Sequence, residues 1–450
     1  MPKLLNAMPL ERTNRIFLHP VHQEAVGTVA QLIGDLRQCR NPEDYFTFQQ
    51  GLLMKVLAVQ KYRTGCRWVA KLLRQGKTVP ADAPELRSAE PADSPETWEL
   101  EVDVCERVDR QLRSVADALA WRMFNYDRRV IIALSRNQHP GQMAGKEGLA
   151  AELAFLAVWW REERRFVLLH DLTTCLSIGD ATSFKEVGAE YEAYLHEIKS
   201  DTSRKPDRRT AKQLRRQLMA EEAIRSGGPL PGELPGRLVQ LDLPYKTHLD
   251  LLGRSFELAH QRGIQGMKVP GGRSLVTTDT VRGYELWSEQ ELIDRTATEH
   301  LQATKRAHIL GKGQLVYART DDMVARSPTM PPWAIYPLSP ELCTRLIADY
   351  ALFIVTMSSD SVLAALDDVG LAAEWVLPVD QGAIEPDQVV LRVGNRRRII
   401  ELRWVEMQRR LLFEMADLPT WAESIKQLLA AENTGRHPWA LFADEWRVWA

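Results

Sequence analysis

Three residues in the second quarter of the chain have types and spacing suited to reactions at phosphate. Asp180 follows a glycine, and Glu197 and Lys199 form a Glu-x-Lys triplet at the end of a strand-like run. Mg²⁺ prefers oxygen ligands and commonly takes one or two carboxylates together with water and substrate phosphate. A bound cation neutralises the charge that develops during phosphodiester hydrolysis. We therefore expect Asp180 and Glu197 to be metal ligands.

Lys199 is the expected cationic side chain of the same site. Side chains alternate along a strand, so Glu197 and Lys199 should lie on one face, with Ile198 on the other. The ammonium of Lys199 would then lie beside the metal. There it could orient the attacking water and neutralise developing negative charge.

Glu152 is a fourth candidate, and it comes from an expected helix. It lies four residues before Leu156, next to Leu153, and so shares the apolar face of that helix. A lone carboxylate in such a place is costly unless it is paired or binds a metal. Glu147 is the alternative upstream carboxylate, in a more polar position.

The elements that must position these residues are a helix, three strands and a second helix. Hydrophobic periodicity predicts a helix over residues 145–162. Strands are expected at residues 165–169, 174–184 and 191–198, and a basic helix at about residues 210–225. A Glu-x-Lys triplet alone is common by chance, so the interpretation depends on this order of elements.

The order of elements, with Asp180, Glu197-Ile198-Lys199 and Glu152, resembles the PD-(D/E)xK nuclease superfamily over about residues 140–226. The resemblance implies a restriction-endonuclease-like core and catalytic roles for Asp180, Glu197, Lys199 and Glu152. It also implies metal-dependent cleavage with Mg²⁺ or Mn²⁺, with DNA favoured over RNA, and by analogy a part in bacterial restriction or antiphage defence. One departure is that Gly179, and not a proline, precedes the aspartate.

The segment after the triplet is strongly basic. Residues 199–217 hold eight basic and two acidic residues, a local net charge of +6 in a chain of net charge −2. Such a run is usually a solvated face, but beside a phosphodiester site it is the footprint expected for a nucleic-acid backbone. The candidate nucleic-acid contacts are Arg204, Lys205, Arg208, Arg209, Lys212, Arg215 and Arg216.

The 450 residues, with 45% hydrophobic and 26% charged side chains, are ordinary for a globular protein of several domains. Prolines in residues 76–97 and a Gly/Pro-rich stretch at 227–236 predict boundaries. The expected regions are an N-terminal helical region with a solvated linker (1–96), a nuclease-like domain (97–228) and a C-terminal α+β domain (229–450). The expected fold class is α/β, and the resemblance implies a mixed sheet in the nuclease-like core.

Helical periodicity is also clear outside the candidate core. Residues 22–75 and 98–135 are expected to be helical, and further helices are predicted at residues 248–261, 288–308 and 340–356. The segment 389–402 is expected to form a hairpin.

Several classes of protein are excluded or disfavoured. No run approaches the roughly 18 apolar residues of a membrane helix, and the start has no apolar signal core, so a cytoplasmic protein without a membrane partner is expected. Five separated cysteines without a CxxC motif predict buried thiols. A protein partner or a homo-oligomer, formed through the N- or C-terminal domain, stays open.

Three alternatives to a metal-dependent nuclease are open. One is a nucleic-acid-binding or scaffold protein on a decayed nuclease fold, and another is an ordinary solvated hairpin. The third follows from Arg295 and His300, which fit the Arg-x4-His pattern and resemble the metal-independent HEPN-type ribonucleases. Cleavage that persists in EDTA and depends on His300 would favour the HEPN-type ribonuclease over a metal-dependent nuclease.

Overall fold

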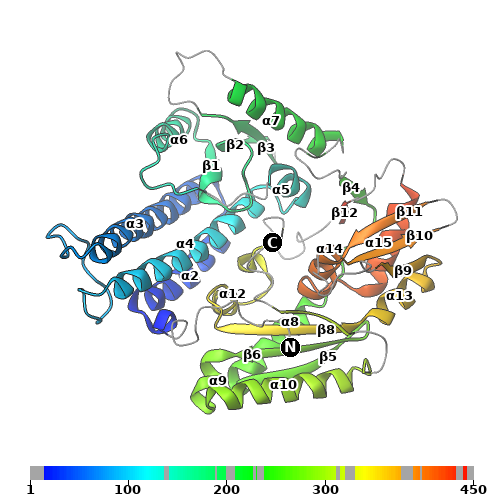
Figure 1. The fold of residues 1–450 in the computed structure, drawn as a ribbon. Helices are drawn as coiled ribbons and strands as arrows, with labels where there is room; N and C mark the ends of the chain where they lie inside the picture. Colours follow the sequence, from blue (N-terminus) through cyan, green and yellow to red (C-terminus); the bar gives the residue numbers. More distant parts are fainter. Residues whose placement is uncertain are drawn as a thin grey trace. The chain divides into compact units, whose positions relative to one another are not determined.

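The computed structural model describes residues 15–135, 141–187, 190–198, 208–226, 230, 238–310, 315–319, 330–376, 389–395, 398–431 and 439–442. The chain forms mixed α/β structure (Figure 1), which confirms the expected class. It divides into two compact units. The first comprises Met1–Ala120, Gln138–Asp207 and Pro332–Ala334, and the second comprises Trp121–Asn137, Arg208–Pro331 and Ile335–Ala450.

This division differs from the expected boundaries near residues 96 and 228. The first unit joins the N-terminal helices to the segment that carries Asp180 and Glu197, because helix α3 (Pro42–Arg74) packs against strand β1 (Phe166–Leu169). The proline-rich segment is also no solvated linker. Its Val79, Ala83 and Leu86 pack against a buried cluster that includes Trp98.

Three long helices form the support of the first unit. Each of α2 (Pro20–Gln38), α3 and α4 (Pro95–Met123) begins with a proline. Proline is tolerated there because the first amides of a helix have no partner within the helix. Asn41 separates α2 from α3, since its side chain accepts hydrogen bonds from the amides of Glu43 and Asp44.

The helix expected over residues 98–135 is two helices. After α4 the backbone takes positive φ angles of 52° at Asn125 and 57° at Tyr126, a conformation that cannot continue a right-handed helix. The carboxylate of Asp127 then caps α5 (Arg128–Leu134) by accepting a hydrogen bond from Arg129 N.

The expected helix and three strands around the candidate residues are present. Helix α6 (Leu149–Glu163) precedes an antiparallel meander of β1, β2 (Ala181–Val187) and β3 (Glu190–His196). Among the described residues this sheet is antiparallel throughout, and not the mixed sheet that the resemblance implies. The expected strand over residues 174–184 begins only at Ala181. Before it, the buried carboxylate of Asp117 accepts hydrogen bonds from the backbone amides of Thr174 and Cys175 and holds them in a turn.

Strand β1 lies at an edge of this sheet, where unpaired backbone groups would invite unwanted pairing. The buried side chain of Gln49 on α3 closes that edge. Its amide donates to the carbonyl of Val167 at 2.8 Å and accepts from the amide of Leu169 at 3.1 Å. The sheet is therefore held against helix α3 by hydrogen bonds to the backbone of β1 as well as by apolar contacts.

The second unit contains a four-stranded antiparallel sheet in the order β5-β6-β8-β7, with α8 and α10 packed on β5 and β6. A second antiparallel sheet has the order β11-β10-β9, and β4 pairs in parallel with β12. The strands are β4 (Leu238–Leu241), β5 (Ile264–Val269), β6 (Arg273–Asp279), β7 (Leu315–Arg319), β8 (Ala351–Ser358), β9 (Ala372–Val376), β10 (Val390–Gly394), β11 (Ile399–Arg403) and β12 (Trp439–Phe442). The helices that follow α5 in this unit are α7 (Arg208–Ser226), α8 (Leu249–Arg262), α9 (Thr280–Leu286), α10 (Glu289–Arg306), α12 (Pro340–Ile347), α13 (Ser359–Asp368), α14 (Trp404–Gln408), the π-helical turn η4 (Arg409–Phe413) and α15 (Leu418–Ala430).

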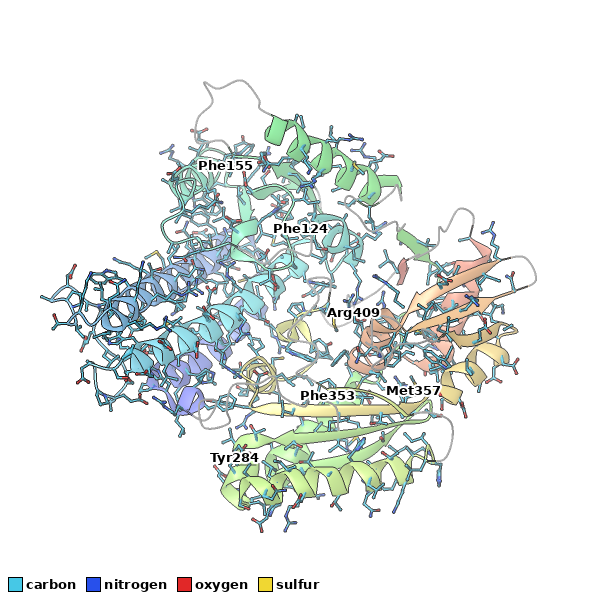
Figure 2. All side chains as sticks on the ribbon, viewed as in Figure 1. Phe124, Phe155, Tyr284, Phe353, Met357 and Arg409 are labelled. Carbon is cyan, nitrogen blue, oxygen red and sulfur yellow. The ribbon has the colours of Figure 1, made fainter. Side chains whose placement is uncertain are left out.

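The helix expected over residues 340–356 is wrong in its second half. Helix α12 ends at Ile347, Asp349 has a φ of 59°, and the chain continues as strand β8 between β6 and β7. Phe353 and Met357, labelled in Figure 2, lie on this strand. A strand buried on both faces shows no alternation, so its apolar run cannot be distinguished from a buried helix by periodicity.

Two further expectations can be compared with the structure. All five cysteines are described, and they are buried thiols outside any disulfide, as expected. Among the helices in the described part of the chain, none is both long and apolar enough to cross a membrane.

Candidate active site

Asp180 is positioned by the glycine that precedes it. Gly179 has a φ of 76°, and a Cβ atom there would lie 3.1 Å from the carbonyl oxygen of His196. A proline, whose ring fixes φ near −65°, could not take this conformation. The departure from the proline of the superfamily pattern therefore has a local structural reason.

Asp180 and Glu197 lie at the same end of the sheet. Ala181 pairs with His196 in the β2–β3 ladder, so the two acidic residues flank the last pair of that ladder. The amide of Asp180 donates to the carbonyl of His196 at 2.8 Å, and the Asp180 carboxylate accepts the amide of Ile198 at 2.6 Å. Both candidate carboxylates are half-buried.

Glu197 lies just past the end of β3, which stops at His196. The strand alternation used to place Lys199 beside Glu197 therefore does not extend to these residues. Lys199 itself, like Arg204 and Lys205, is outside the described residues.

Glu152 lies on the apolar face of α6, as its spacing predicts. Glu152 and Leu156 are the two buried residues on this helix, and Glu152 is only 3% exposed. Glu147, the alternative, is exposed in the turn before the helix. Ring contacts connect α6 to the end of β3, because His196 lies 5.0 Å from Phe155 and 5.5 Å from Trp159 between ring centroids.

Lys146 and Asp171 are part of this site, and sequence reasoning did not assign them to it. The ammonium of Lys146 donates to Glu152 Oε1 at 2.6 Å and also to Asp171 Oδ2. Asp171 belongs to the 3₁₀ turn η1 (His170–Leu172) that follows β1. The other carboxylate oxygen of Glu152, Oε2, is buried and has no hydrogen-bond partner among the described residues.

The electrostatics of the cluster follow from this crowding of acids. Burial, and then the negative charge of Glu197, raises the pKa of Asp180 above its ordinary value, and Asp171 adds to the rise. Burial likewise raises the pKa of Glu152, with further contributions from Asp171 and Asp180, although Lys146 opposes the rise. The carboxylates thus lie close enough to repel one another.

The chemistry of Asp180 and Glu197 suits a small cation that takes two protein carboxylates. Within the part of the chain that the structure describes, no three His, Cys, Asp or Glu side chains gather in a group that could hold a metal. Mg²⁺ is commonly bound through only one or two protein carboxylates, with water and substrate phosphate completing its shell. Asp180 and Glu197 can provide two carboxylates, and the unpartnered oxygen of Glu152 is a further acceptor nearby.

The two histidines near the site have structural contacts. Both ring nitrogens of the buried His170 are occupied, by the carbonyl of Ile178 at 2.8 Å and the hydroxyl of Thr182 at 2.7 Å. Burial lowers the pKa of His170 to about 4. His196 is hydrogen-bonded to Ser183 at 2.8 Å. Both side chains hold the end of the sheet that carries Asp180.

The expected basic helix is α7, which packs on α5 in the second unit. Lys212 and Arg215 are exposed and Arg216 is half-buried. Arg208 and Arg209 begin the helix, but their side chains are outside the described part. The helix is confirmed as an element, and its contact with nucleic acid stays a prediction.

Arg295 and His300, the two residues of the ribonuclease alternative, lie on helix α10, as expected. Each contacts a different neighbouring side chain. The guanidinium of Arg295 lies 4.7 Å from the ring centroid of Trp287. The ring of His300 is hydrogen-bonded to the hydroxyl of Thr356 at 2.7 Å, and burial lowers its pKa. Neither contact favours a joint catalytic role.

Comparison with known proteins gives no family or function for this site. No protein-family model matches the chain. No curated protein and no solved structure gave a significant match to it either.

Proposed function

We propose that the protein is a metal-dependent nuclease whose site lies at the end of the β1–β3 meander. The observation that carries the proposal is the grouping of Asp180, Glu197 and Glu152, partly or wholly buried, at one end of an antiparallel sheet. A hairpin with only a structural role has no need to bury Asp180 and Glu152, whose pKa values are raised by burial and by neighbouring acids. Perturbed acids gathered in this way favour a functional site.

The roles follow from position. Asp180 and Glu197 would hold Mg²⁺ or Mn²⁺, and the cation would supply electrostatic stabilisation of the phosphate oxygens. Glu152, anchored on α6, would hold water or the edge of the cation shell through its unpartnered oxygen. Lys199 is proposed from the sequence alone as the group that neutralises charge on the reacting phosphate. DNA is the favoured substrate.

Metal dependence is the first expected result. The purified chain should nick or degrade DNA in Mg²⁺ or Mn²⁺ and should lose this activity in EDTA, because Asp180 and Glu197 need a cation to act on a phosphodiester. Agarose-gel assays with supercoiled plasmid and with single-stranded DNA measure this. Cleavage that persists in EDTA would contradict the proposal, and its loss in the His300→Ala variant would then favour the ribonuclease alternative.

The role of α7 gives a second expected result. Replacing Lys212 or Arg215 with alanine should weaken DNA binding and lower the magnitude of the log–log salt slope by about 1, because each phosphate contact releases counterions. Fluorescence anisotropy over a range of salt, in Ca²⁺ to block turnover, measures both quantities.

A matched control for these variants is Lys426→Ala. Lys426 is exposed and pairs with Glu423 at 3.2 Å on α15, so its loss removes the same charge elsewhere. The role of α7 would be refuted if substitution of its five basic residues, Arg208, Arg209, Lys212, Arg215 and Arg216, left both affinity and salt slope unchanged.

A further inference from the structure

Lys146 occupies a defined place in the carboxylate cluster. It lies in a short turn before α6 in which Gly145 has a φ of 81°. From there its ammonium reaches both Glu152 on α6 and Asp171 on η1. Although burial acts to lower it, the hydrogen bonds to Asp171 and Glu152 raise the pKa of Lys146, so the side chain stays charged.

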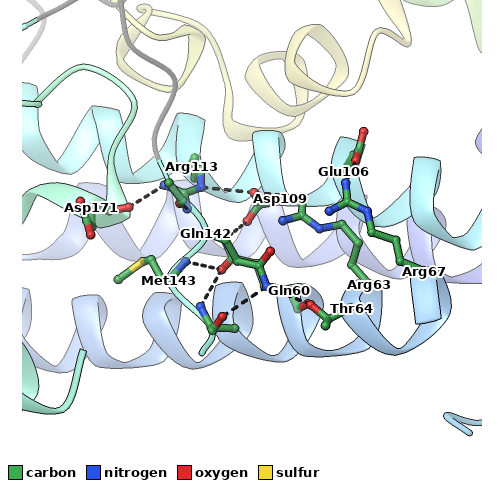
Figure 3. Close-up of polar contacts among 12 residues, drawn as sticks. Gln60, Arg63, Thr64, Arg67, Glu106, Asp109, Arg113, Gln142, Met143 and Asp171 are labelled. Atoms are coloured by element: carbon green, nitrogen blue, oxygen red, sulfur yellow. Dashed lines mark hydrogen bonds and ion pairs between the residues drawn. The ribbon is translucent and has the colours of Figure 1, made fainter. Parts of the chain in front are cut away.

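The two turns that bring Lys146 and Asp171 together are fixed by Gln60 on α3 and Arg113 on α4, whose contacts with Met143 and Asp171 are drawn in Figure 3. The side-chain oxygen of Gln60 accepts the amides of Met143 and Ala144 at 2.8 and 3.0 Å. The buried guanidinium of Arg113 donates to the carbonyl of Asp171 at 2.6 Å and to that of Gly141 at 3.0 Å. The ion pairs of Lys146 are therefore built into the first unit and are not chance surface contacts.

Acidic side chains crowd the cluster around Lys146. The charges of Asp171 and Asp180 act on Glu152, and those of Glu197 and Asp171 act on Asp180. The positive charge of Lys146 opposes both effects. The ammonium of Lys146 contacts one oxygen of Glu152, Oε1, whereas the other, Oε2, is buried and has no partner among the described residues. A cation that binds Glu152 must therefore share that carboxylate with Lys146 or displace the ammonium.

We propose that Lys146 is a positioning residue that serves as the built-in counter-ion of these carboxylates and competes with a divalent cation for Glu152. This inference rests on the proposed metal site and adds a component that the sequence motif does not contain. With no cation bound, Lys146 holds Glu152 and Asp171 in place. When the cation binds, the ammonium gives up Glu152 and stays beside Asp171.

The direction in which Mn²⁺ affinity changes when Lys146 is replaced tests this role. Loss of a competing charge should tighten Mn²⁺ binding, whereas loss of a lysine that only holds the fold should weaken it. In Lys146→Met the side-chain length is kept and the charge is lost. Calorimetric titration of the full chain with Mn²⁺ alone should show at least about tenfold tighter binding than in the wild type, as expected when a positive charge a few ångströms away is removed. Lys185→Met, which removes an exposed charge on β2, should change the affinity less than about twofold.

Two further variants connect the effect to Glu152. Lys146→Arg keeps the charge and should stay close to the wild-type affinity. The double variant Lys146→Met, Glu152→Gln should lose most of the gain, because the released carboxylate is then absent. An unchanged or weaker affinity in Lys146→Met, with wild-type Mn²⁺ binding intact, overturns this inference alone, and absence of Mn²⁺ binding in both chains overturns the metal site with it.

A measurement on the wild type keeps the test independent of variant folding. The side chain of Lys146 is 34% exposed and so accessible to a small acylating reagent. Mn²⁺ should increase the rate at which Lys146 is acetylated, read by mass spectrometry with Lys185 as the internal reference. A rate that does not change with Mn²⁺ at saturation would contradict the release of Glu152.

Discussion

Replacing Asp180 with asparagine is expected to lower Mg²⁺-dependent DNA cleavage by at least about 10²–10³-fold, the scale on which loss of one electrostatic group at a reaction centre acts. The asparagine side chain can still accept the amide of Ile198, which now donates to Asp180 at 2.6 Å. What is lost is the negative charge. Cleavage rates of wild type and variant under single-turnover conditions measure the effect.

The same substitution should leave the melting temperature unchanged or raise it. Burial and the charge of Glu197 raise the pKa of Asp180, so the folded state disfavours its ionised form, and a neutral side chain removes that penalty. Glu192→Gln, at an exposed position on β3, is the matched control and should affect neither activity nor stability. A large drop in melting temperature in Asp180→Asn would instead support the hypothesis of a structural hairpin.

Replacing Glu414 with alanine should destabilise the second unit by about 3–5 kcal/mol, the usual result of breaking a buried ion pair. Glu414 is fully buried and accepts hydrogen bonds from Arg128 at 2.8 Å, Arg410 at 3.1 Å and the hydroxyl of Tyr245 at 2.5 Å. Although burial acts to raise it, Arg128 and Arg410 hold the pKa of Glu414 below its usual range. Without Glu414 the buried guanidinium of Arg128 loses its counter-charge.

Urea denaturation of the full chain, followed by circular dichroism, measures this loss. Glu423→Ala is the control, because its pair with Lys426 is exposed and should contribute only about 0–1 kcal/mol. Equal effects of the two substitutions on the free energy of unfolding would contradict the structural importance of the buried network.

The sequence predicted the part of the site that depends on local periodicity. Glu152 was placed on an apolar helix face by its spacing from Leu156, and the two are the buried residues of α6. The three strands were predicted from short apolar runs, and the β2–β3 pairing brings Asp180 and Glu197 to one end of the sheet. Apolar side chains recur along a helix or a strand with the period of that element, so a single sequence is enough to detect them.

The other parts of the site depend on contacts between residues far apart in the sequence, which leave no periodic pattern. Lys146 and Asp171 lie in two turns, 25 residues apart, and meet because Arg113 and Gln60 on distant helices fix those turns. Lysine is scarce, with 15 among 58 basic residues, but Lys146 lies in no motif and nothing in the sequence singles it out. The strand β8 was mistaken for helix because no side chain on either of its faces is exposed, so its apolar run lacks the alternation of polar residues that marks a half-exposed strand.

Anomalous diffraction at the manganese edge, from crystals of the full chain grown with Mn²⁺, tests the central claim most directly. The account predicts a peak bound by the carboxylates of Asp180 and Glu197 at the end of the β2–β3 ladder. A peak only at other residues, or no peak with these two carboxylates pointing apart, would contradict it.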